Sequence, residues 1–208
     1  QGAIHENVDA WIGLGFLTLE RYQTTEKDQR TGIVKELDDI EKALIAIDPV
    51  HARLIDFRAR RLLFDDQREE AKSLVTKAIE TSEDPAVLRA FLAELAMQAG
   101  DAKTAISQLE KALESNPDES DLWLLLASLY GDQGESTKAI SALEQAARSA
   151  PFDPQIHAEL VRAYQTVGQT DKALKAGKEL ATRFPGRIEG AVVLIEQALF
   201  AEDYERVV

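Results

Sequence analysis

The apolar positions along the chain follow the spacing of helix faces. In the best-defined segment they recur at i, i+3, i+4 and i+7, at Trp123, Leu126, Ala127 and Tyr130. A break at Gly134 follows, and then a second apolar stripe of the same helical kind. Glycine adopts the left-handed conformation that closes a helix more readily than other residues. The pattern therefore predicts two amphipathic helices joined by a tight turn.

This helical hairpin repeats along the chain with a period of 34 residues. The residues that keep the period are Gly100, Gly134 and Gly168; Ala71, Ala105, Ala139 and Ala173; Pro117, Pro151 and Pro185; Leu92, Leu126, Leu160 and Leu194; and Ala78, Ala112 and Ala146 with Leu180. Small alanine side chains allow two helices to cross at about 8 to 10 Å. One hairpin alone cannot bury its apolar face, so we expect several to stack into an all-α array.

Aspartate–proline pairs mark the starts of two repeats. Asp84 precedes Pro85, and Asp153 precedes Pro154. Aspartate is a favoured N-cap and proline is favoured in the first helical turn, so we expect a helix to begin at each pair.

The repeat resembles the tetratricopeptide family. The residues that carry the resemblance are Trp123, Leu126, Ala127, Tyr130, Gly134, Ala139, Leu143, Ala146 and Pro151. The resemblance implies a right-handed α-α superhelix, a solenoid of about six stacked helical hairpins. The expected units are 8–51, 52–85, 86–119, 120–153, 154–187 and a truncated 188–208, with an N-terminal tail at 1–7.

Two units depart from the family pattern. In the unit 52–85, Arg58 takes the place of the repeated leucine and Asp66 that of the repeated glycine. The first unit is too long, and its polar stretch 21–32 predicts either a lengthened hairpin or a protruding loop. The chain ends inside a repeat and has no initiator methionine, so we expect it to be a fragment of a longer protein.

Composition narrows the possible partners. The 208 residues include 37 acidic and 24 basic side chains, a formal net charge of −13. Nucleic acids and anionic membranes bind clustered positive faces, so the charge argues against both as the main partner. The absence of cysteine excludes disulfides and thiolate zinc sites. No apolar run approaches the roughly 18 to 20 residues of a membrane span, so we expect no direct membrane insertion.

The sequence lacks the patterns of an active site, and we expect no catalysis, no cofactor and no metal. The histidines are His5, His51 and His157, and none has a partner at metal-ligand spacing. Gly13-Leu14-Gly15 lacks both the third glycine and the preceding strand of a dinucleotide-binding motif. A catalytic domain outside these 208 residues stays open as an alternative.

In the resembled family the first helices of successive hairpins line a groove that holds a partner peptide or helix. Placed in that register, the candidate partner-binding residues are Phe16, Leu19, Arg53, Asp56, Arg60, Leu63, Phe64, Ala90, Glu94, Met97, Leu124 and Arg162. The groove is therefore expected to be apolar and basic near its N-terminal end.

Arginines gather at that end, at Arg53, Arg58, Arg60, Arg61 and Arg68. Arginine beside large apolar residues is a common binding hot spot, which would suit a partner with acidic and apolar side chains. The alternative is that Arg58 and Arg61 pair with nearby acids, such as Asp65, Glu69 and Glu70. The apolar residues would then pack against the lengthened first hairpin.

We expect a non-catalytic scaffold that binds another protein or peptide. An alternative is a structural or accessory subunit of a bacterial cell-envelope assembly, for exopolysaccharide export or secretion, acting partly through self-association. Val192, Leu199 and Phe200 are candidates for such association, although they could equally bury against a further repeat. The compartment stays open between the cytoplasm and a bacterial periplasm or envelope.

Overall fold

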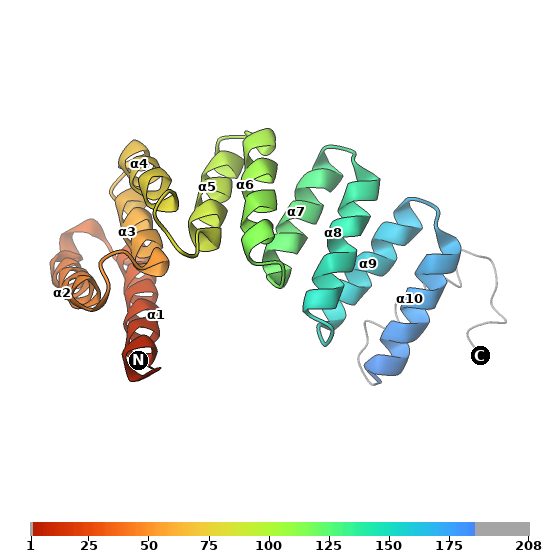
Figure 1. Cartoon of the computed structure of the whole chain (residues 1–208), viewed down its shortest axis with the longest axis horizontal. Coiled ribbons are helices and arrows are strands. Elements are labelled where there is room, and N and C mark those ends of the chain that lie inside the picture. Colours follow the sequence, from red (N-terminus) through yellow and green to blue (C-terminus); the bar gives the residue numbers. More distant parts are fainter. Residues whose placement is uncertain (1, 186–208) are drawn as a thin grey trace. The chain divides into compact units, whose positions relative to one another are not determined.

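The computed structural model describes residues 2–185, which contain α-helices, one short 3₁₀ turn and no strand (Figure 1). The chain divides into two compact units, 1–115 and 116–208, which are treated separately below. The helices are α1 (Gly2–Thr24), α2 (Thr31–Ile47), α3 (Ala52–Phe64), α4 (Arg68–Ile79), α5 (Ala86–Gln98), α6 (Ala102–Ser115), α7 (Ser120–Asp132), α8 (Ser136–Ser149), α9 (Pro154–Thr166) and α10 (Thr170–Arg183). The all-α repeat fold predicted from the sequence is confirmed.

The helices pair into successive hairpins, and the first helices of four hairpins start 34 residues apart, at Ala52, Ala86, Ser120 and Pro154. The expected sixth hairpin at 188–208 lies outside the described residues, as do Val192, Leu199 and Phe200.

The turn inside these hairpins has one conformation. Gly100, Gly134 and Gly168 all have φ of 73°. In each turn the next residue donates its N–H to the carbonyl five positions earlier, for example Asp101 to Ala96. This is the Schellman closure of a helix C-terminus. The hairpin α3/α4 makes the same turn with Asp66 at φ 60°, so replacement of the glycine left the turn geometry unchanged.

The two aspartate–proline pairs differ in detail. The Asp153 carboxylate accepts a hydrogen bond from the Gln155 N–H, and Pro154 is the first residue of α9, as predicted. The Asp84 carboxylate also accepts a backbone N–H, that of Ala86, but α5 begins only at Ala86. The prediction that Pro85 would lie within the helix is therefore wrong by one residue.

The first hairpin is longer than the others. α1 has 23 residues and α2 has 17, and the polar stretch 21–32 contains the end of α1, a 3₁₀ turn at Lys27–Gln29 and the start of α2. The excess residues therefore lengthen the hairpin instead of forming a protruding loop. α1 already begins at Gly2, so residues 2–7 extend this helix and do not form the separate tail that we expected.

Close helix packing holds the first unit together. Phe57 of α3 is fully buried, and its ring lies against Gly15 of α1 and within the cluster that includes Leu37 and Ile40 of α2. A Cβ atom on Gly15 would come within 2.9 Å of the Phe57 ring. The absence of a side chain at this position therefore lets α1 and α3 approach closely.

In the described part of the second unit, a proline carbonyl connects the hairpins α7/α8 and α9/α10 each to the loop before it. The Pro117 carbonyl accepts from the Trp123 indole at 2.7 Å and from the Ser149 hydroxyl at 3.3 Å. The Pro151 carbonyl interacts in the same way with the His157 ring nitrogen and Arg183. These paired contacts fix both helices of a hairpin to one point of the preceding loop.

Candidate functional site

A cleft of about 600 Å³ opens between α1 and α3. Its lining residues are Gly13, Phe16, Leu17, Leu19, Glu20, Asp56, Arg60 and Phe64, and we call it the α1/α3 cleft. The α1 residues Gly13, Phe16, Leu17 and Glu20 lie at i, i+3, i+4 and i+7, which places them on one helix face. On α3, the lining residues Asp56, Arg60 and Phe64 are four residues apart, so they also lie on one helix face.

The cleft has apolar walls that are only partly covered. Phe16 packs edge-to-face on Phe57, with ring centroids 6.1 Å apart, which fixes the orientation of its ring. Leu17 is 61% exposed, and Phe64 is half-buried. Leu19 is buried and belongs to the core of the hairpin. Exposed apolar surface beside a rigid aromatic ring suits an apolar side chain of a ligand.

Charged side chains form a closed network at the cleft. The Nε atom of Arg60 donates to Asp56, at 3.1 Å and 3.2 Å from its two carboxylate oxygens. The two terminal nitrogens of Arg60 donate to the two oxygens of Glu94 on α5, at 3.0 Å and 3.1 Å. The guanidinium also lies 5.5 Å from the Phe91 ring centroid. Each of the three nitrogens of Arg60 therefore donates to a carboxylate of this chain.

Asp56 is the buried member of this network, with 5% of its surface exposed. Burial raises the pKa of its carboxyl from 3.8 to about 6, because removal from water disfavours the charged form. The neighbouring Arg60 guanidinium opposes that shift. The buried carboxylate thus depends on Arg60 for compensation of its charge.

The structure brings five of the twelve residues predicted for the site into the cleft: Phe16, Leu19, Asp56, Arg60 and Phe64. Glu94 joins them through Arg60. Leu63 packs against the apolar cluster between α3, α4 and α5, Ala90 is half-buried, and Met97 is exposed. In the second unit, Leu124 packs against the core, and Arg162 is exposed and pairs with Glu159 at 2.8 Å.

The other arginines of this group also have partners within the chain. Arg53 pairs with Asp9 of α1. Arg58 pairs with Glu41, and Arg61 with Asp38 and Glu41, so both contact α2. Arg68 donates to the Leu95 carbonyl and the Gln98 amide oxygen. Pairing of Arg58 and Arg61 with acids was expected, but the acids come from α2 and not from Asp65, Glu69 or Glu70.

Sequence reasoning missed Gly13, Leu17 and Glu20 of the cleft. The register taken for α1 selected Phe16 and Leu19, and Leu19 is buried at 2% exposure. Gly13, Leu17 and Glu20 share with Phe16 a face rotated slightly around α1. Their i, i+3, i+4, i+7 spacing was the signal available in the sequence.

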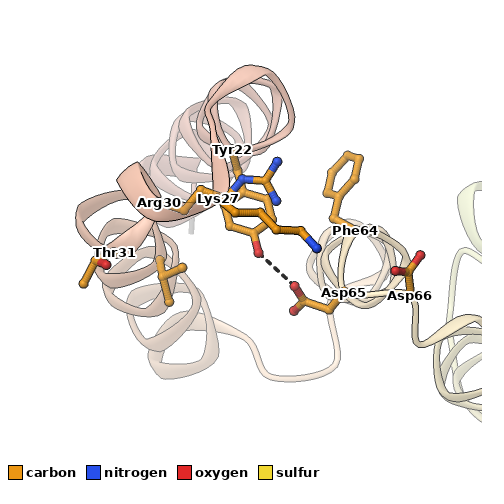
Figure 2. A pocket seen from close by; sticks show the side chains of 8 residues that line it. Tyr22, Lys27, Arg30, Thr31, Phe64, Asp65 and Asp66 are labelled. Atoms are coloured by element: carbon orange, nitrogen blue, oxygen red, sulfur yellow. Dashed lines mark hydrogen bonds between the residues drawn. The ribbon is translucent and has the colours of Figure 1, made fainter.

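A second hollow, of about 550 Å³, lies where the first hairpin turns (Figure 2). The Tyr22 hydroxyl donates to Asp65 at 2.9 Å, linking the end of α1 to the end of α3. The Arg30 guanidinium lies 4.5 Å from the Tyr22 ring centroid and donates to the Thr25 carbonyl. These contacts bind the long hairpin to α3, which explains the hollow as part of the packing.

Within residues 2–185, His, Asp and Glu side chains form no group of three suited to holding a metal ion. Each helix of that part of the chain is too short or too polar to span a bilayer.

Comparison with known proteins agrees with this geometry. A family model for the tetratricopeptide repeat matches residues 62–129 and, overlapping them, residues 96–160. Among curated proteins, no sequence matches the chain.

Solved structures share the fold at low sequence identity. PilF of Pseudomonas aeruginosa is 17% identical, over 99% of this chain and 89% of that chain, with a TM-score of 0.65. YrrB, described as a tetratricopeptide protein with an unusual peptide-binding site, is 20% identical over 81% and 87%, with a TM-score of 0.59. MamA from Desulfovibrio magneticus is 18% identical over 75% and 88%, with a TM-score of 0.56. At these identities the likeness establishes the fold alone.

The repeat pattern, the hairpin geometry and the family match agree on the class: residues 62–160 match the tetratricopeptide repeat, and the described helices form hairpins of that kind. Proteins of this family are typically non-catalytic scaffolds that bind protein or peptide partners, and this chain has the fold of such a scaffold.

Proposed function

We propose that the chain is a non-catalytic interaction scaffold, and that the α1/α3 cleft holds a peptide segment of its partner through a large apolar side chain. The observation that carries the proposal is the cleft itself, in which Phe16, Leu17 and Phe64 offer partly exposed apolar surface on two rigid helices. YrrB, with a related fold, is described as having a peptide-binding site, which supports peptide binding by this array.

The size of the cleft suits one or two side chains of a peptide. A volume of about 600 Å³ lies within the usual range for ligand pockets. Burial of one large apolar side chain contributes about 1.5 to 3 kcal/mol. Loss of that contact should therefore weaken binding by roughly ten- to a hundredfold.

Gly13 offers a way to fill the cleft without disturbing the fold. It lies on α1 and lines the cleft, and a Cβ atom placed on it meets no atom within 4 Å. A Gly13→Trp substitution should therefore occupy the cleft with its indole. Gly131 on α7 is an equally open helical glycine in the other unit, so Gly131→Trp is a matched control.

The test uses 12-residue peptides selected from a random library on the wild-type chain. Fluorescence anisotropy then gives the dissociation constant of each selected peptide for the wild type and both variants. We expect Gly13→Trp to weaken binding at least about tenfold and Gly131→Trp to leave it unchanged. Equal binding by Gly13→Trp, or failure to select any peptide, would contradict the proposal.

A further inference from the structure

The charged residues that line the α1/α3 cleft are mostly acidic. Glu20 and Asp56 line it as carboxylates, and Arg60 lines it as the opposing cation. Glu94 adds a second carboxylate to Arg60. The cleft and its supporting network thus contain three carboxylates and one guanidinium, so together they are acidic.

We infer that the segment entering this cleft carries a lysine or arginine beside its large apolar side chain, and that Glu20 pairs with that cation. The inference rests on the proposed function, because it assigns the chemistry of the peptide held by the same cleft. It reverses the acidic partner that the run of arginines suggested.

Arg60 is a poor receptor for an acidic ligand because each of its three nitrogens already donates to a carboxylate, and two carboxylates neutralise its charge. Its Nε atom and both terminal nitrogens are directed at Asp56 and Glu94. An incoming carboxylate would either displace one of these partners or use the remaining terminal N–H bonds of Arg60, where it would be repelled by the two carboxylates already bound. Displacement of Asp56 would leave a buried carboxylate without its compensating charge, which is costly in a protein interior.

The remaining arginines are not available to the cleft either. Arg53, Arg58 and Arg61 pair with acids of α1 and α2, and none of them lines the cleft. Lys27 and Arg30 line the hollow at the hairpin turn and are absent from the cleft lining.

Glu20, in contrast, is exposed, and within the described residues its carboxylate has no hydrogen bond or ion pair. The neighbouring Arg21 pairs with Glu36 at 2.9 Å and is not shared with it. Glu20 is therefore the charged group of the cleft that is free to receive a ligand.

The position of Glu20 sets the spacing expected in the ligand. Glu20 lies three and four residues after Leu17 and Phe16, so it is one helical turn from the apolar surface. A ligand cation within about two residues of the apolar anchor can reach it, since a peptide extends at most about 3.3 to 3.6 Å per residue. The methylene groups of lysine or arginine can pack on exposed Leu17 while the charge reaches Glu20.

The experiment must separate this local pairing from general attraction, because the chain as a whole carries a net charge of −13. We compare Glu20→Gln and Glu20→Lys with Glu114→Gln, which removes the same charge at an exposed position on α6. The probes are the selected 12-residue peptides and matched versions in which each lysine or arginine near the apolar anchor is replaced by glutamate.

We expect the selected peptides to carry lysine or arginine within two residues of a large apolar residue. Glu20→Gln should weaken their binding about two- to fivefold, and Glu20→Lys should weaken it further and favour the glutamate-substituted peptides. Glu114→Gln should bind as the wild type does. The Glu20 effect should also shrink in high salt, since an exposed ion pair is screened.

Two outcomes would overturn the inference: selection of acidic peptides, or equal binding by the wild type and Glu20→Gln. If Gly13→Trp still blocks binding in either case, the cleft is the docking site and only the cation assignment is wrong. If Gly13→Trp has no effect, the proposed function itself fails.

Discussion

Asp56 should make the stability of the first unit depend on pH in an unusual direction. Its pKa is raised from 3.8 to about 6 by burial, so the folded state holds the proton more tightly than the unfolded state does. The stabilising contribution is complete below about pH 4 and is lost as the pH rises through 6. A shift from 3.8 to about 6 corresponds to about 3 kcal/mol.

The perturbation is Asp56→Asn, which removes the titrating carboxyl at nearly constant volume. Urea unfolding gives the free energy of unfolding of both proteins between pH 4 and pH 7.5. Other acids titrate in both proteins and largely cancel in the difference. Relative to the variant, the wild type should lose about 2 to 3 kcal/mol between pH 4 and pH 7.5.

The readout must report on the first unit alone. The chain has two tryptophans: Trp11, which packs against the core of the first unit, and Trp123, which lies in the second. A Trp123→Phe background therefore makes the fluorescence of Trp11 specific for the transition of interest. As a control, Glu114→Gln removes a carboxylate from an exposed position.

A difference between wild type and Asp56→Asn that stays constant over this range would refute the reasoning. So would one that changes in the opposite direction. A constant difference would mean that the ion pair with Arg60 balances the cost of burying the carboxyl, and a change in the opposite direction would mean that the ion pair outweighs it.

Three further predictions concern packing and turns, and each is checked by the same urea unfolding. Gly15→Ala should destabilise the first unit by about 1 to 3 kcal/mol, because its Cβ would meet the Phe57 ring. Gly13→Ala, where a Cβ meets no atom, should instead stabilise α1 by about 0.5 to 1 kcal/mol. Equal effects of the two substitutions would contradict the close approach of α1 and α3 at Gly15. Asp66→Gly should stabilise by about 0.5 to 1 kcal/mol, because glycine adopts positive φ without strain; a loss of stability would indicate that the Asp66 side chain contributes more than the strain costs. Phe91→Ala should cost about 3 to 5 kcal/mol, since the ring is fully buried; a cost below 1 kcal/mol would mean that the core collapses around the gap.

The fold was predictable because local signals and the long period agree. Helix starts at Ala86, Ser120 and Pro154 coincide with the unit starts inferred from the 34-residue spacing. Asp66 shows why the repeat tolerated an exception: aspartate is among the few residues other than glycine that reach the left-handed region at modest cost. The left-handed conformation that this turn requires is therefore provided by aspartate in one hairpin and by glycine in the others.

The site was less predictable because its contacts depend on stacking. Arg58 and Arg61 pair with Glu41 and Asp38, acids about 20 residues earlier, because α2 packs on α3. Proximity in the sequence had favoured nearby acids such as Asp65 as their partners. The longer first hairpin also changes the face that α1 presents, so a register transferred from regular repeats missed Glu20.

Arg60 and Glu94 hold the same position in two consecutive hairpins, 34 residues apart, and yet carry opposite charges. In a stack of identical units, a residue that reaches the next unit at this position meets its own copy. Two arginines would then repel each other where the ion pair now lies. The divergence between these repeats therefore also specifies their order: duplicating the hairpin 52–85 next to itself would place like charges together. The charge difference between these two hairpins therefore determines which of them can lie next to the other, and one cannot replace the other in the stack.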